Sequence, residues 1–204
     1  MKTHLIQSRE LFGPPDRQEE LREVWQRNEG LFDCYTHPEG RPTFGELFRM
    51  CKPGMLNVIA NADIYFDRSS INGFGRLMVY NTLEAGRHTV KSDLFALSRW
   101  DVDPTGVPML WSHHDSQDTW IVYGGPHEVD APYTMGVPGC DNALIHALQQ
   151  AGFTVSNPSK SIRTYHLHLS NYRSYLDNGN GQGRGGAKLY RVPPPYAFVQ
   201  PTEL

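Results

Sequence analysis

The stretch MLNVIANADIYF, residues 55–66, decides how the chain is expected to fold. Its first half is almost continuously apolar, which is typical of a central strand in a parallel sheet, buried on both faces. The apolar run breaks at Asn61 and Asp63 before it resumes. Ligands of open α/β sheets bind beyond the carboxyl ends of the strands. The stretch therefore predicts a buried strand that delivers Asn61 and Asp63 to a ligand-binding crevice.

The residues before this stretch alternate between strand and helix patterns. The predicted elements are a strand at 4–7, a helix at 14–30 with Asp16 and Glu19 as a capping box, a strand at 31–35, and a helix at 42–50 with Thr43 and Glu46 as a second capping box. This order indicates an α/β protein with an open twisted mixed sheet flanked by helices. The 204 residues are enough for one domain with a substantial core.

After residue 67 the pattern is less regular, and no second domain boundary is visible. The predicted elements are a helix at 71–83, strands at 94–100 and 119–125, a helix at 139–152, a strand at 161–170, a mobile glycine-rich loop at 177–187, and an extended proline-rich tail at 191–204. We therefore expect a single domain over 1–204, with halves at 1–67 and 68–170 followed by the loop and tail of 171–204.

Composition excludes several classes of protein. The net charge of −3 gives no overall field that would attract nucleic acid, although it does not exclude a local basic patch. No apolar run reaches about 18 residues, so no membrane-spanning helix is expected, and the first residues do not resemble a secretory signal. The three cysteines are far apart in sequence, which favours reduced thiols in a reducing, cytoplasmic compartment.

Asp63 and a histidine pair are candidates for a metal site. A carboxylate at the end of a buried strand needs a cation or a hydrogen-bond donor, and a divalent ion that carries a phosphate would provide one. Alternatively, Asp63 caps the next turn. In YHLHLS, residues 165–170, the period of two puts His166 and His168 on one face of a strand. They are either metal ligands or a hydrogen-bonded, partly buried pair.

Three other segments carry candidate polar residues. Asp141 and Asn142 lie at the start of the predicted helix 139–152, where Asp141 is either an N-cap or faces a substrate hydroxyl. Arg99, within the predicted strand 94–100, points to solvent, pairs with a carboxylate or contacts a diphosphate. Asp118 lies at the start of strand 119–125, where it could touch a substrate, after a polar loop whose histidines imitate no familiar ligand set.

Taken together and in this order, these motifs resemble the nucleotide-sugar glycosyltransferases of the GT-A fold. The segment IANAD, residues 59–63, resembles the DxD metal motif of that family, with Asn61 in place of the first acid. By this resemblance Asp63 and one of His166 and His168 hold Mn²⁺ or Mg²⁺, and Asp141 is the acidic position below the donor sugar. The departure at Asn61 lowers the negative charge at the metal.

The resemblance extends to small bacterial and phage glycosyltransferase-like sequences, and to enzymes of the base J type that glucosylate hydroxymethylated pyrimidines in DNA. It implies a nucleoside-diphosphate sugar, UDP-glucose first, as the donor and a hydroxyl as the acceptor. Residues 171–192 carry basic and tyrosine side chains that could contact a phosphate backbone and stack on a base, or could form a lid or a loop.

The sequence therefore predicts a metal-dependent hexosyltransferase. Asp141 and Asp118 are its expected catalytic residues, and Asn61, Asp63, Arg99 and Asn142 are expected to bind the donor. Two alternatives remain: a metal-dependent hydrolase of nucleotide sugars or phosphodiesters, and an inactive nucleotide-sugar-binding module.

Overall fold

The computed structural model describes residues 1–84, 93–170, 172 and 191–204, and the side chains of 78–84 are left out of the description. Four helices and ten strands are present in this part of the chain. The helices are α1 (Pro15–Asn28), α2 (Phe44–Arg49), α3 (Arg68–Glu84) and α4 (Cys140–Gln150). The strands are β1 (Thr3–Ile6), β2 (Cys34–Thr36), β3 (Leu56–Ala60), β4 (Ile64–Tyr65), β5 (Asp93–Leu97), β6 (Trp100–Val102), β7 (Pro108–Leu110), β8 (Thr119–Tyr123), β9 (Thr154–Ser156) and β10 (Tyr165–His166).

The large sheet is mixed, with strand order β2-β1-β3-β8-β5-β9. Strands β2, β1 and β3 are parallel, β8 is antiparallel to both of its neighbours, and β9 is parallel to β5. The reversed strand β8 therefore begins at the edge where β3 and β5 end. Its first residue, Thr119, pairs with both Ala60 and Leu97. The α/β class with a mixed sheet, predicted from sequence, is confirmed.

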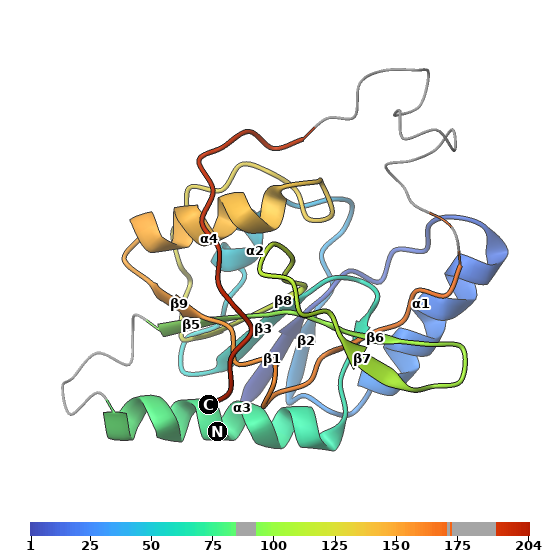
Figure 1. Cartoon of the computed structure of the whole chain (residues 1–204), viewed down its shortest axis with the longest axis horizontal. Coiled ribbons are helices and arrows are strands. Elements are labelled where there is room, and N and C mark those ends of the chain that lie inside the picture. Colours follow the sequence, from blue (N-terminus) through green and yellow to red (C-terminus); the bar gives the residue numbers. More distant parts are fainter. Residues whose placement is uncertain (85–92, 171, 173–190) are drawn as a thin grey trace.

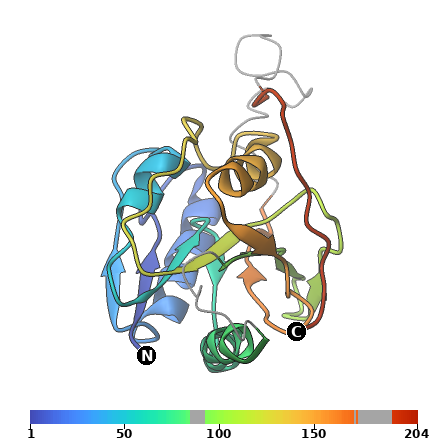
Figure 2. The same cartoon turned by 90° about the vertical axis from the view of Figure 1, so that its left-hand side faces the viewer.

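Both faces of the large sheet are covered, with α2 and α4 on one face and α3 on the other (Figures 1 and 2). Alternate residues of β3 supply the two cores: Ile59 packs with the residues of α2 and α4, whereas Val58 packs with Phe74 of α3. This burial on both sides explains why the sequence of β3 is apolar with little alternation.

A smaller sheet, with strand order β4-β10-β6-β7, lies beside the large one. The segment 55–66 thus forms two strands in different sheets, separated at Asn61–Asp63, rather than one long strand. The prediction of one strand over 94–100 is wrong in the same way, because β5 ends at Leu97 and β6 begins at Trp100. Between them Ser98 is fully buried, and its Oγ donates to the carbonyl oxygen of Ser116 at 3.0 Å.

Two further local predictions are wrong. Helix α1 begins at Pro15 with Pro14 as its N-cap residue, so Asp16 lies in the first turn and caps nothing. Proline suits the first helical position because its φ is fixed and it has no N–H to satisfy, which lets the helix start before Asp16. The strand predicted at 161–170 is limited to β10, Tyr165–His166. The second capping box, Thr43 with Glu46, is confirmed.

The C-terminal segment 191–204 is extended, as predicted, and runs past α4 (Figure 1). It is not confined to the surface, because Val192 and Val199 are buried in the core beside α4. The glycine-rich loop predicted at 177–187 lies outside the described residues. Within the described part of the chain, none of the helices has the length and apolar character needed to cross a bilayer.

Candidate functional site

The register of the small sheet brings three distant segments together. His166 of β10 pairs with Ile64 of β4 on one side and with Asp101 of β6 on the other. Asp63 directly precedes β4, and its carbonyl oxygen accepts a hydrogen bond from the backbone N–H of Leu167 at 3.0 Å. The sheet therefore holds Asp63, His166 and Asp101 side by side.

Asp63, His166 and His168, called the metal trio here, form one compact cluster. Nε2 of His166 lies 3.2 Å and Nδ1 of His168 lies 3.5 Å from Oδ2 of Asp63. All three potential ligand atoms lie within 4.8 Å of one another. The two histidines share one face, as the sequence predicts, while Leu167 between them is buried on the other side.

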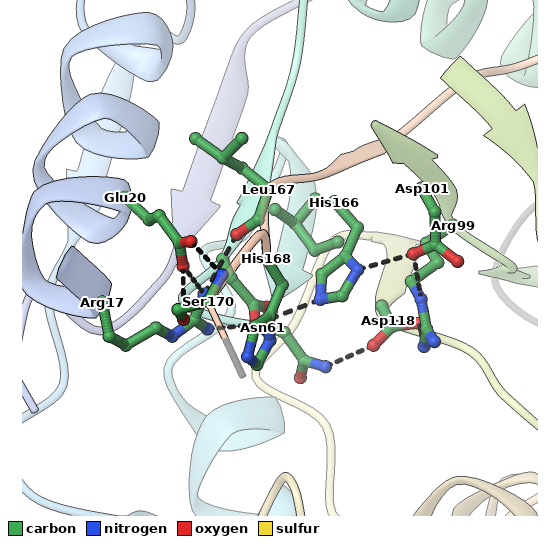
Figure 3. Close-up of polar contacts among 12 residues, drawn as sticks. Arg17, Glu20, Asn61, Arg99, Asp101, Asp118, His166, Leu167, His168 and Ser170 are labelled. Carbon is green, nitrogen blue, oxygen red and sulfur yellow. Dashed lines mark hydrogen bonds and ion pairs between the residues drawn. The ribbon is translucent and has the colours of Figure 1, made fainter. Parts of the chain in front are cut away.

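Asp63 also has a cationic partner that the sequence prediction missed. Arg17 of α1, only 1% exposed, donates from Nη2 to Oδ2 of Asp63 at 2.5 Å. Its Nη1 donates to Glu20 at 2.8 Å (Figure 3). Burial alone would raise the pKa of Asp63, but the charge of His166, hydrogen bonds from both histidines and Arg17 hold that pKa well below its usual range. Asp63 is therefore a permanent anion in this site.

His166 is held between two carboxylates. Its Nδ1 lies 2.6 Å from Oδ1 of Asp101, opposite the nitrogen that faces Asp63 (Figure 3). Burial would lower the pKa of His166, but the charge of Asp63 and the hydrogen bonds to Asp101 and Asp63 raise it to about 9. Without a competing cation, the imidazole is therefore protonated at neutral pH.

Asp118, just before β8, lies at the centre of a second cluster of hydrogen-bonded side chains. Its Oδ1 accepts from Nδ2 of Asn61 at 2.6 Å, and its Oδ2 accepts from Nη1 of Arg99 at 3.0 Å (Figure 3). Nε of Arg99 donates to Asp101 at 2.8 Å. Arg99 thus lies between β5 and β6 and, of its three predicted alternatives, pairs with carboxylates. It also connects Asp118 to the residue that holds His166.

Asp141 lies in the first turn of α4, whose N-cap is Gly139 with a φ of +83°. The alternative that Asp141 is itself the N-cap is therefore wrong. Its Oδ1 accepts a weak hydrogen bond from the thiol of Cys140 at 3.3 Å. Burial and the negative charge of Asp118 raise the pKa of Asp141 to about 8. Asp118 and Asp141 are called the acid pair here.

One cavity of about 450 Å³ joins these groups. Its wall includes the metal trio, the acid pair, and every other site residue predicted from sequence, namely Asn61, Arg99 and Asn142. The amide oxygens of Asn61 and Asn142 are buried and have no hydrogen-bond partner among the described residues. Two such acceptors in the wall could each receive a hydrogen bond from a ligand hydroxyl.

The residues that sequence reasoning missed are Arg17 and Asp101. For Arg17 a signal was available: residues 17, 21, 24 and 28 recur at helical spacing, and these four are the buried residues of α1. For Asp101 there was none, because its role depends on the pairing of β6 with β10. Of the basic and aromatic segment 171–192, only Tyr172, Arg191 and Val192 are described, and Tyr172 and Arg191 line the cavity.

The donor set of the metal trio fits a divalent transition metal. One carboxylate and two imidazoles suit Mn²⁺ and its neighbours better than Mg²⁺, which prefers oxygen ligands. The ligand atoms are close enough for one ion to reach all three after small side-chain rotations.

Comparison with known proteins identifies no relative: no family model, no curated protein and no solved structure matches this chain.

Proposed function

We propose that this protein is a metal-dependent glycosyltransferase that moves a hexose from a nucleoside-diphosphate sugar to a hydroxyl acceptor. The observation that carries the proposal is the convergence of the metal trio and the acid pair on one cavity, from segments as distant as residues 63, 118, 141 and 166–168. The resemblance of IANAD and the late histidines to the GT-A motifs supports the same assignment.

Asp63, His166 and His168 would hold the divalent ion, with Mn²⁺ preferred over Mg²⁺ because two of the three ligands are nitrogens. When bound, the ion supplies positive charge to the leaving diphosphate. Arg99, already oriented by Asp101 and Asp118, adds a second positive charge at the cavity wall. Asn61 and Asn142 offer buried amide oxygens that fit the hydroxyls of a ribose or a hexose.

The acid pair would handle the acceptor proton. The anomeric carbon loses its bond to the diphosphate oxygen and gains one to the acceptor oxygen, and the hydroxyl proton passes to the Asp141 carboxylate. Asp118 keeps Arg99 and Asn61 in place and raises the pKa of Asp141 towards neutrality. A pKa near the working pH is the range in which a general base is most effective.

For the acceptor we propose a hydroxymethylated pyrimidine in DNA. Tyr172 and Arg191, which flank the undescribed residues 173–190, line the same cavity and would contact a nucleic acid there. The three free cysteines fit work in a reducing, cytoplasmic compartment. A bacterial or phage DNA-modification role follows from the resemblance.

The test is mass spectrometry of oligonucleotides that contain hydroxymethylcytosine or hydroxymethyluracil, after incubation with Mn²⁺ and a panel of nucleotide sugars that begins with UDP-glucose. We expect a gain of one hexose on the modified base. Unmodified oligonucleotides and the Asp141→Asn variant are the controls. No hexose gain on any of several hydroxyl acceptors, with the donor left intact, would contradict the proposal.

A hydrolase of nucleotide sugars or phosphodiesters is the second candidate, and one observation favours it. With a pKa of about 8, Asp141 carries a proton at pH 7 and could act as a general acid towards a leaving group. A hydrolase consumes the donor without an acceptor, so the acceptor-free reaction separates the two. An inactive binding module would turn over nothing, and nucleoside diphosphates with Mn²⁺ would raise its melting temperature little.

A further inference from the structure

Asp101 is not among the residues that line the cavity, yet it contacts two residues that do, His166 and Arg99. Its Oδ1 receives two hydrogen bonds, from Nδ1 of His166 at 2.6 Å and from Nε of Arg99 at 2.8 Å. Arg99 also donates a hydrogen bond to Asp118. The other ring nitrogen of His166, Nε2, faces Asp63. Oδ1 of Asp101 thus orients both His166, a member of the metal trio, and Arg99, the partner of Asp118.

The position of Asp101 is fixed by the backbone. β6 and β10 are parallel, with Asp101 directly opposite His166 and Trp100 opposite Tyr165. Neighbouring side chains of paired strands point to the same face, so the carboxylate and the imidazole meet without help from a flexible loop. The ring of Trp100, on the alternate face, packs with the buried cluster that includes Tyr165.

The chemistry of this pair determines which nitrogen of His166 can bind a metal. A carboxylate only accepts hydrogen bonds, so the nitrogen that faces Asp101 must carry a proton. Nε2, which lies 3.2 Å from Asp63, also carries a proton while no metal is bound, and it is this second proton that a metal ion beside Asp63 would displace. Metal-binding histidines commonly donate their other ring N–H to a carboxylate, which fixes the tautomer and makes the ligand more basic.

We infer that Asp101 is the positioning residue of the metal centre, which holds His166 as the Nδ1–H tautomer with Nε2 turned towards the ion. This inference rests on the metal site of the proposed function. It goes beyond that function because Asp101 is neither a member of the metal trio nor a residue of the cavity wall. Through Arg99, the same carboxylate also ties the metal trio to the acid pair.

The experiment measures Mn²⁺ affinity directly, by titration calorimetry and by the electron paramagnetic resonance of free Mn²⁺, without nucleotide or acceptor. Asp101→Ala removes the acceptor of the Nδ1 proton and should weaken Mn²⁺ binding by about 10- to 100-fold. Asp101→Asn retains a neutral acceptor and should give a smaller loss. The affinity should therefore fall in the order wild type, Asn, Ala.

Asp115→Asn is the matched control for charge. Asp115 is an exposed carboxylate that also lines the cavity, but its side chain contacts neither histidine. Its loss removes the same negative charge and should change Mn²⁺ affinity by no more than about twofold. Thermal melting without metal identifies any variant whose affinity falls because the fold is damaged.

Nitrogen NMR of His166 gives a readout that a merely structural role would not move. In the metal-free wild-type protein, at a pH high enough for His166 to be neutral, Nδ1 should carry the proton, whereas in Asp101→Ala the preference for this tautomer should be lost. Equal Mn²⁺ affinity in Asp101→Ala and Asp115→Asn, in folded proteins, would overturn the inference. So would a wild-type protein that binds no Mn²⁺, which also removes the metal centre. Failure of sugar transfer alone, with the affinity order intact, would contradict only the proposed activity.

Discussion

The metal trio and the acid pair, called the two ends of the cavity here, shift the pKa values of their aspartates in opposite directions. At the metal trio, Oδ2 of Asp63 is approached by Arg17, His166 and His168, and the pKa of Asp63 is held well below its usual range. At the acid pair, Asp141 is buried near a second carboxylate, and its pKa rises to about 8. Two aspartates that line one cavity thus differ in whether they hold a proton at pH 7.

The difference comes from the partners that each segment brings. Asp63 meets cationic groups from α1 and β10, so its charge is compensated in a partly buried position. The positive charge that lowers the pKa of Asp141 is that of Arg99, which already forms ion pairs with Asp118 and Asp101. One end is therefore suited to binding a cation, and the other to exchanging a proton.

The largest effect is expected from Asp63→Asn. It removes the anionic metal ligand but leaves an amide oxygen that can accept from Arg17, so we expect transfer to fall by about a thousandfold or more. Asparagine is preferred to alanine because alanine leaves a buried arginine without this partner, which costs about 3–5 kcal/mol when a buried ion pair is broken. Steady-state rates with Mn²⁺, compared at equal folded fraction, provide the measurement. Wild-type rates in this variant would remove Asp63 from the metal centre.

Asp141→Asn tests the other end of the cavity. Without the proton acceptor, kcat should fall by about a hundredfold or more, while the Kd for UDP with Mn²⁺ should stay within a few-fold of that of the wild type. Rapid-quench rates and calorimetric nucleotide binding measure the two quantities separately. If nucleotide affinity falls in parallel with the rate, Asp141 binds the donor rather than the acceptor proton.

The third prediction concerns the pH dependence of kcat/KM, which reports the protonation of Asp141 in the acid pair. A general base works in its deprotonated form, so kcat/KM should rise about tenfold per pH unit below pH 8 and level off above it. Asp118→Asn removes the like charge that raises the pKa of Asp141, and should move this midpoint to lower pH. A rate that instead falls as pH rises through 8 would assign Asp141 as a general acid, as expected for the hydrolase.

Much of this arrangement was accessible from the sequence because it depends on local patterns. The apolar run of β3 predicted a strand buried on both faces, and its break at Asn61 and Asp63 predicted the edge where the cavity lies. The alternation in 165–168 placed His166 and His168 on one face even though the regular strand ends at His166. These features need only the geometry of a single segment.

What the sequence could not give depends on contacts between segments. The pairing of β6 with β10 aligns Asp101 with His166 across 65 residues of chain. The partner of Asp63 in α1 is equally non-local, and a lone arginine in a polar helix is usually solvated. The raised pKa of Asp141 could not be predicted either, since it requires the reversed strand β8 to bring Asp118 to the same edge of the sheet.

The last prediction concerns the pH dependence of folding stability, which should reflect the raised pKa of Asp141. Because the folded-state pKa of Asp141 lies above its usual value of 3.8, the folded state binds this proton more tightly than the unfolded chain. The associated stabilisation is complete below pH 3.8 and is lost as pH rises towards 8. Asp141→Asn does not titrate, so its melting temperature relative to the wild type should increase by roughly ten degrees between pH 5 and pH 8.

Thermal melts of the metal-free, nucleotide-free protein at intervals of one pH unit measure this slope. Asp115→Asn is the control, because Asp115 is exposed and its difference from the wild type should stay constant over the same range. A constant difference for Asp141→Asn as well would mean that Asp141 is ionised throughout. The contrast between the two ends of the cavity would then be one of position and not of protonation, and the pH dependence of transfer would need a different group.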